Sequence, residues 1–101
     1  MRPLLLTALT IGLLGTIAPA HAAGDAAAGK AKATACGMCH GPNGEGTSMA
    51  PKLGGMDQAK FVQAMQDYKS GRKDNAMMKS QAAALSDADM ANLAAYYATL
   101  K

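Results

Sequence analysis

The alternation of apolar and polar positions divides the chain into an apolar N-terminal run, one loop and several amphipathic segments. Residues 4–17 form an apolar run that is broken only by threonine and glycine. Residues 41–56 contain five glycines and two prolines, a composition typical of a loop. Elsewhere apolar side chains recur every three or four residues, which is the spacing of an amphipathic helix. The pattern predicts an all-α chain with about four helices and no second folded domain.

The four predicted helices cover about residues 26–39, 57–68, 75–84 and 86–100. The first is rich in alanine, the strongest helix former, and Asp25 is its expected N-cap. The apolar stripes of the second and the last helix are expected to form the core. Their members are Phe61, Val62, Met65 and Tyr68 in the second helix, and Met90, Leu93, Ala94 and Tyr97 in the last.

Residues with strong positional preferences mark several of these helix ends. Gly71 is expected to end the second helix, and Ser86 to cap the start of the last. Asp89 stands three residues after Ser86, where it completes a capping box. Gly29 lies inside the first helix, where a glycine often marks the close approach of another backbone.

Residues 1–22 have the three parts of a secretory signal peptide. Arg2 supplies the positive charge, the apolar run has 14 residues, and a small-x-small site ends at Ala22. The run is shorter than the ~20 residues that a helix needs to span a bilayer, although an uncleaved N-terminal anchor is the alternative interpretation. We expect cleavage after Ala22, with Ala20 as a second option, and a domain of residues 23–101 in the periplasm.

The composition leaves little material for a hydrophobic core. The chain has no tryptophan, one phenylalanine and three tyrosines. The formal net charge of +3 falls to +2 once Arg2 is removed, so the charge does not indicate a nucleic-acid partner. A domain of 79 residues with so few large side chains needs a further source of buried apolar surface.

Cys36, Cys39 and His40 form the motif C-x-x-C-H, the attachment sequence of a c-type haem. One helical turn brings two thiols close enough to bond the two vinyl groups of one porphyrin. The next residue, His40, then reaches the iron as an axial ligand. A buried porphyrin would also supply the missing apolar surface. We therefore predict one haem c, with its iron, per chain.

Two other interpretations of the cysteine pair fit less well. A structural zinc site needs four ligands, and no second pair of Cys or His follows the motif. A thioredoxin-like redox motif is expected in a βαβ context, and no strand pattern follows the cysteines. A haem-free dithiol protein therefore remains only as a weaker alternative.

The loop after the motif is expected to wrap one face of the haem. Leu53 would point at the ring, and the carbonyl of Pro51 would accept the free N–H of His40 and so fix the orientation of the imidazole. On the opposite face, either Met77 or Met78 would supply a thioether as the second axial ligand.

Together these motifs resemble the short class I cytochromes c with one haem, and either half of the bacterial di-haem cytochromes c. The resemblance covers residues 23–101. In that family the distal methionine lies seven residues before the leucine of a Leu-Ser-Asp cap, which implies Met78 rather than Met77. The family also crosses its first and last helices at a glycine and an aromatic, which Gly29 and Tyr96 match. The resemblance rests on Ala23-Gly24-Asp25, Cys36-Gly37-Met38-Cys39-His40-Gly41, Pro51-Lys52-Leu53, Tyr68-Lys69-Ser70-Gly71-Arg72, Met78, Leu85-Ser86-Asp87 and Ala94-Ala95-Tyr96.

The resemblance implies a small cytochrome c fold around one covalent haem and a function as a periplasmic one-electron carrier rather than an enzyme. Its partners would be a membrane quinol-oxidising complex and a terminal oxidase or reductase, which dock transiently at the haem edge. The alternative is a haem enzyme or gas sensor with an open distal site. The basic side chains expected around the haem edge are Lys52, Lys69, Arg72, Lys73 and Lys79.

Overall fold

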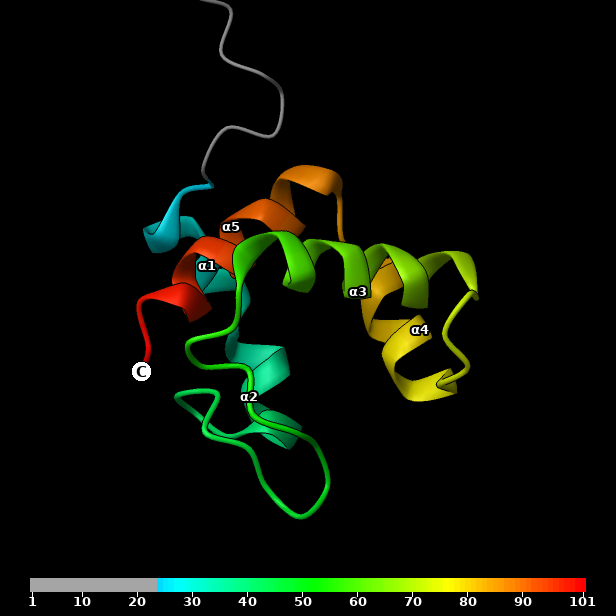
Figure 1. Ribbon diagram of the computed structural model, residues 1–101, viewed down its shortest axis with the longest axis horizontal. Helices are drawn as coiled ribbons and strands as arrows, with labels where there is room; N and C mark the ends of the chain where they lie inside the picture. The colour runs from blue at the N-terminus through cyan, green and yellow to red at the C-terminus, as the bar shows by residue number, and fades with distance from the viewer. Residues whose placement is uncertain (1–23) are drawn as a thin grey trace, which may run out of the picture.

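The computed structural model describes residues 24–101, which are all helix, turn and loop. Five helices follow one another in the order α1 to α5 (Figure 1), and no strand occurs in this part of the chain. The predicted all-α class is thus confirmed, whereas the signal peptide of residues 1–22 lies outside the described residues. The helices are α1 (Ala26–Lys32), α2 (Thr34–His40), α3 (Gln58–Ser70), α4 (Ala76–Ala83) and α5 (Asp87–Ala98).

The helix predicted over residues 26–39 is divided into α1 and α2 at Ala33. The backbone N–H of Ala33 is shared between the carbonyls of Gly29 and Lys30, at 2.9 and 3.3 Å. Such sharing tightens a helical turn locally. Ala33 keeps right-handed helical angles, and the two segments replace one predicted helix.

The capping residues expected at helix ends are confirmed by their geometry, whereas the last helix ends at Ala98 rather than at residue 100. Asp25 accepts from the first turn of α1, and Asp57 accepts from the N–H of Lys60 at the start of α3. Gly71 ends α3 with a left-handed backbone at φ 83°. Ser86 and Asp89 form the expected capping box of α5, and the bond from the Ser86 N–H holds the pKa of Asp89 below its ordinary value.

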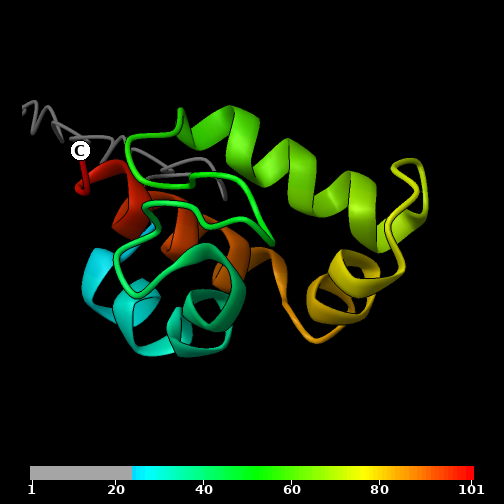
Figure 2. The ribbon, with the colours of Figure 1, turned by 90° about the horizontal axis from the view of Figure 1, so that it is seen from below.

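Helices α1 and α5 pack across each other at Gly29, as the resemblance implied (Figures 1 and 2). A Cβ built on Gly29 would lie 2.0 Å from the backbone oxygen of Asn92 and 2.8 Å from Cβ of Tyr96. The backbone N–H of Asp25 also donates to the side-chain oxygen of Asn92 at 2.8 Å. Only a glycine therefore permits this distance between the two helices.

The apolar stripes of α3 and α5 meet in the core, as predicted. The largest fully buried side chains are Tyr97, Phe61, Met90 and Leu93. The ring of Tyr97 lies 5.7 Å from that of Phe61, between centroids. This core joins α1, α3 and α5 into one packed body.

Helices α2 and α4 stand apart from each other. The backbone of α4 lies close to that of α3 only, and the backbone of α2 lies close to that of α1 only, among the described helices. Both ribbon views place α2 and α4 on different sides of the molecule (Figures 1 and 2). Within residues 24–101, no helix has the length and apolarity that crossing a membrane requires.

Candidate functional site

Cys36 and Cys39 lie one turn apart on α2 and are both half-buried. The thiols are not joined to each other. Burial raises the pKa of the Cys36 thiol, and a hydrogen bond with the side chain of Tyr97 partly offsets that rise. Between the cysteines, Met38 is 80% exposed and points away from the core. Helix α2 thus has one face that can meet a porphyrin edge and another that faces solvent.

His40 ends α2 and is buried, with 6% of its surface exposed. Its Nδ1 lies 2.6 Å from the carbonyl oxygen of Pro51, so the predicted hydrogen bond is confirmed. Since a carbonyl only accepts, Nδ1 carries the proton and Nε2 keeps its lone pair for a metal. His40 is therefore oriented for ligation by the loop that follows it.

The loop of residues 41–56 folds back on the end of α2 and holds it. The backbone N–H of Gly46 donates to the carbonyl of His40 at 2.7 Å, and the Thr47 hydroxyl donates to the carbonyl of Cys39 at 2.5 Å. Leu53 is 8% exposed and joins the core cluster, while Pro51 is exposed and contributes through its carbonyl. The loop thus fixes the end of α2 through hydrogen bonds and places Leu53 in the core.

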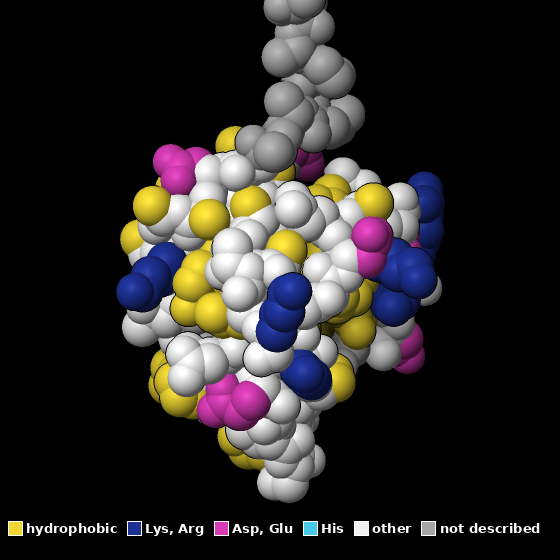
Figure 3. Space-filling model, turned by 60° about the vertical axis from the view of Figure 1, so that its left-hand side comes forward, with side chains coloured by type: hydrophobic (Ala, Val, Ile, Leu, Met, Phe, Trp, Pro, Cys, Tyr) yellow, Lys and Arg dark blue, Asp and Glu magenta, His cyan; other side chains and the backbone are white. Residues whose placement is uncertain are grey.

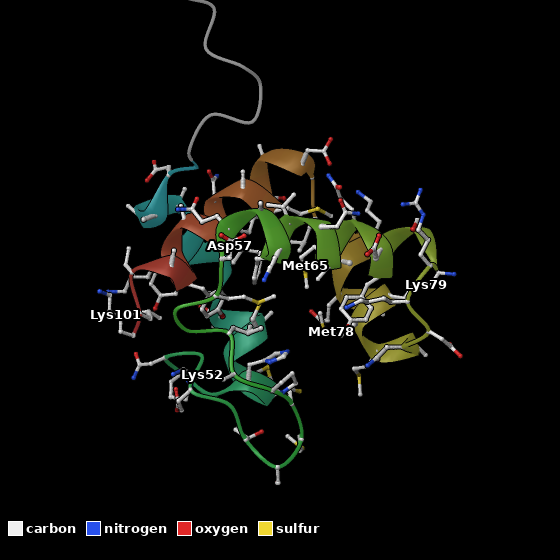
Figure 4. The ribbon with its side chains drawn as sticks, in the orientation of Figure 1. Lys52, Asp57, Met65, Met78, Lys79 and Lys101 are labelled. Atoms are coloured by element: carbon white, nitrogen blue, oxygen red, sulfur yellow. The ribbon has the colours of Figure 1, made fainter. Side chains whose placement is uncertain are left out.

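The two candidate distal methionines differ in their surroundings. Met77 is 67% exposed, whereas Met78 is partly buried against the core cluster. In Figure 4, the side chain of Met78 lies on the side of α4 nearer α2. The side-chain oxygen of Asn75 accepts from the backbone N–H of Met78 at 3.0 Å and so fixes the first turn of α4. The surroundings of the two residues favour Met78.

These donors fit a haem better than a bare metal ion. The described residues contain no group of three or more His, Cys, Asp or Glu side chains placed to hold a metal ion. Helices α2 and α4 carry the two candidate axial ligands and do not pack against each other. A flat apolar group between them would cover side chains that are only partly buried against the core, namely Cys36, Met56, Val62, Tyr68, Met78 and Leu85.

Several of the basic side chains expected around a haem edge already have partners in the fold. The Lys69 ammonium donates to the carbonyl of Leu85 at 2.5 Å. Arg72 pairs with Asp67 at 3.7 Å, and Lys73 lies over the ring of Tyr68. Lys52 and Lys79 are exposed and lie on opposite sides of the view in Figure 4, one on the loop and one on α4.

Tyr97 was predicted only as a member of the core stripe of the last helix, but the loop after α2 also packs against it. A Cβ built on Gly44 of this loop would lie 2.6 Å from Cε1 of the Tyr97 ring. The backbone N–H of Gly55 donates to the carbonyl of Tyr97 at 2.8 Å. These contacts join positions that are far apart in the sequence, so no local pattern could have revealed them.

The helices, the paired thiols and the oriented histidine define a class of protein: a small all-α domain built to hold a covalent haem. The cytochrome c family model matches residues 26–101, and the chain belongs to this family. It therefore binds a c-type haem, which contains iron, through covalent bonds. Electron transfer is the chemistry of the family.

The relatives include both double-length and single-length cytochromes. The chain is 46% identical over 94 residues to cytochrome c4 of Pseudomonas aeruginosa. The aligned residues cover 92% of this chain and 45% of that protein. It is 43% identical over 91 residues to cytochrome c-554(547) of Halothiobacillus neapolitanus, covering 78% of this chain and 100% of that one. The chain thus spans about half the length of the cytochrome c4 relatives.

A solved structure agrees with this assignment. Cytochrome c4 of Acidithiobacillus ferrooxidans superposes with a TM-score of 0.72 at 30% identity. The superposition covers 74% of this chain and 49% of that structure. The observed fold is therefore that of one half of a cytochrome c4.

Proposed function

We propose that this chain carries single electrons on a haem whose iron keeps two axial ligands, His40 and Met78. One observation carries the proposal. A histidine oriented by a 2.6 Å hydrogen bond lies on α2, and a half-buried methionine lies on the facing side of α4. Permanent ligands on both faces leave no position for a substrate, so the chain acts as a carrier and not as an enzyme.

Each residue of the site has a distinct part in this proposal. Cys36 and Cys39 anchor the porphyrin through thioether bonds, and the Pro51 carbonyl keeps the proton of His40 on Nδ1. Leu53 packs at the ring and excludes water from it. The haem supplies the reversible one-electron change of its iron. Because both axial side chains are held by the fold, little atomic rearrangement accompanies the transfer.

The proposed location is the periplasm, after removal of residues 1–22. The support comes from the sequence: a basic start, a short apolar run and a small-x-small site at Ala22. Export of the chain would also bring its two cysteines to the compartment where c-type haem is attached.

The proposed partners are larger electron-transfer proteins that dock for a short time. By resemblance they are a membrane quinol-oxidising complex and a terminal oxidase or reductase. One relative, at 36% identity, is named as a thiosulfate dehydrogenase electron acceptor. Lysine and arginine side chains are spread over the face in Figure 3, with acidic side chains among them, rather than gathered in one patch. Scattered charges of this kind give weak and salt-sensitive attraction to acidic surfaces.

The distal ligand is tested with the holoprotein and two matched variants, Met78→Ala and Met77→Ala. We expect Met78→Ala to lose the methionine-to-iron charge-transfer absorption of the ferric protein and to show a lower reduction potential, because Met ligation raises the potential. Met77→Ala should match the parent protein, since Met77 is 67% exposed.

Carbon monoxide separates the carrier from an enzyme or gas sensor. The reduced parent protein should bind it slowly or incompletely at neutral pH, and Met78→Ala should bind it rapidly. Rapid and complete binding by the parent protein would overturn the carrier proposal. Loss of the charge-transfer absorption in Met77→Ala alone would assign the ligand to Met77.

A further inference from the structure

Helix α4 carries Met78, and few contacts hold this helix in place. It has 8 residues, of which only Ala82 is buried. Helices shorter than about 12–15 residues are marginally stable alone in water. Among the described helices, the backbone of α4 lies close to that of α3 only, beside the end of α3 in both ribbon views (Figures 1 and 2). The position of Met78 therefore depends on what fixes the two ends of α4.

The first end of α4 is fixed by a cap from the same segment. The side-chain oxygen of Asn75 accepts from the backbone N–H of Met78 at 3.0 Å. The carbonyl of Asn75 accepts from the backbone N–H of Lys79 at 2.8 Å. Both bonds lie within residues 75–79, so they order the first turn of α4 without joining it to another helix.

The other end of α4 is tied to α3 by Lys69. The Lys69 ammonium donates to the backbone carbonyl of Leu85 at 2.5 Å, and the two residues are 16 positions apart in the chain. Leu85 comes two residues after the last residue of α4, and its side chain packs against the core cluster. This hydrogen bond therefore joins α3 directly to the segment in which α4 ends.

The positive charge of Lys69 suits this position. The carbonyls at the C-terminal end of a helix carry a partial negative charge, which a nearby cation stabilises. Helix α4 has no basic residue in its own last turn, so α3 supplies the cation through Lys69. Lys60, in the first part of α3, is also exposed, but its ammonium makes no hydrogen bond or ion pair within residues 24–101.

We propose that Lys69 is a positioning residue whose hydrogen bond to the Leu85 carbonyl holds α4 against α3 and so keeps the Met78 thioether at the iron. This proposal rests on the proposed ligation of the iron by Met78. Lys69 acts from outside the haem site, through the helix that carries the ligand. Its ammonium thus serves the distal side of the fold rather than the attraction of a partner.

The experiment measures carbon monoxide binding by the reduced holoprotein and by variants of α3. Carbon monoxide can bind only when Met78 leaves the iron, so its rate reports how firmly α4 is held. Lys69→Met removes the hydrogen bond and keeps an unbranched side chain, and Lys60→Met is the control with the same loss of charge. We expect binding about 3 to 10 times faster in Lys69→Met, the effect of losing one hydrogen bond, and an unchanged rate in Lys60→Met.

The rate in Lys69→Arg, which keeps a cationic donor, should stay close to that of the parent protein. An unchanged rate in Lys69→Met would overturn the proposal. An equal increase in Lys60→Met would also overturn it, because the loss of a positive charge alone would then explain the effect.

Amide hydrogen exchange separates a local role from a general loss of stability. In Lys69→Met, the backbone amides of α4 should exchange faster than in the parent protein, while those of α1 and α5 should keep their rates. Equally faster exchange in all helices would contradict a positioning role, because it would show that Lys69 stabilises the whole domain and not α4 in particular.

The proposed function is tested apart from this inference by Met78→Ala. Equal rates of carbon monoxide binding in Met78→Ala and the parent protein would contradict ligation by Met78, and with it the proposed function. The exchange of the α4 amides in Lys69→Met would still show whether Lys69 holds this helix, so the two failures are distinguishable.

Discussion

Two residues of the loop after α2, Pro51 and Leu53, contribute to the surroundings of the candidate site. Pro51 contributes a carbonyl that orients His40, and Leu53 contributes a side chain that is 8% exposed. The contact of the Pro51 carbonyl was predicted from the sequence, because a histidine ligand needs a partner for its second nitrogen. Leu53 was predicted to point at the haem ring. The preference for Met78 over Met77 needed the family spacing, and the surroundings of the two side chains agree with it.

Leu53 allows a test at the scale of one side chain. We expect Leu53→Ala to lower the free energy of unfolding of the holoprotein by about 2–5 kcal/mol, the usual cost of truncating a buried leucine. Met49→Ala, in the same loop, is the control, because Met49 is 72% exposed. The free energy of unfolding of Met49→Ala should stay within about 0.5 kcal/mol of that of the parent protein. Denaturant titration measures both, and equal stabilities would contradict the burial of Leu53.

At the scale of helices, local signals predicted most boundaries. Asp25, Asp57, Asn75 and Ser86 each accept a backbone hydrogen bond from the first turn of a helix. The caps at Asp25 and Ser86 were predicted, because a cap acts within four residues of the chain. Those at Asp57 and Asn75 follow the same rule but were not predicted. The division at Ala33 was not predicted, because alanine favours an uninterrupted helix and the sharing of its N–H between two carbonyls leaves no pattern in the sequence.

The crossing of α1 and α5 gives the prediction at this scale. Gly29→Ala should destabilise the holoprotein by about 1–3 kcal/mol, the usual cost of overpacking, since its Cβ would meet the backbone of Asn92. Gly37→Ala is the matched control, because a Cβ there would lie 3.4 Å from Cα of Pro42, an ordinary contact. Thermal unfolding compares the two variants. A Gly29→Ala protein as stable as the parent would contradict the close approach of the helices.

At the scale of the whole molecule, the described helices divide into a shared core and two outer helices. Helices α1, α3 and α5 share one core, whereas α2 and α4 each lie close to a single neighbour. The described part of the chain supplies four aromatic rings, Phe61, Tyr68, Tyr96 and Tyr97. A domain of this size buries a smaller fraction of its surface than a larger domain does, so the haem is expected to hold α2 and α4 against the rest.

Removal of the attachment sites tests this dependence. A Cys36→Ala, Cys39→Ala double variant, which cannot bind haem covalently, should lose the cooperative unfolding transition and part of its helical circular dichroism. Met38→Ala, between the two cysteines, should keep both, since Met38 is 80% exposed. Urea titration followed by circular dichroism makes the comparison. A haem-free variant that unfolds as cooperatively as the parent would show that the polypeptide alone forms the core.

The sequence by itself determined the helix stripes, their caps and the attachment motif, because these depend on residues within a few positions of one another. The tertiary structure decided which distant groups meet: Gly29 with the backbone of Asn92, and Gly44 with the ring of Tyr97. Such contacts depend on the crossing of α1 and α5 and on the return of the loop. Both are set by the packing of the whole core, which no local pattern of residues encodes.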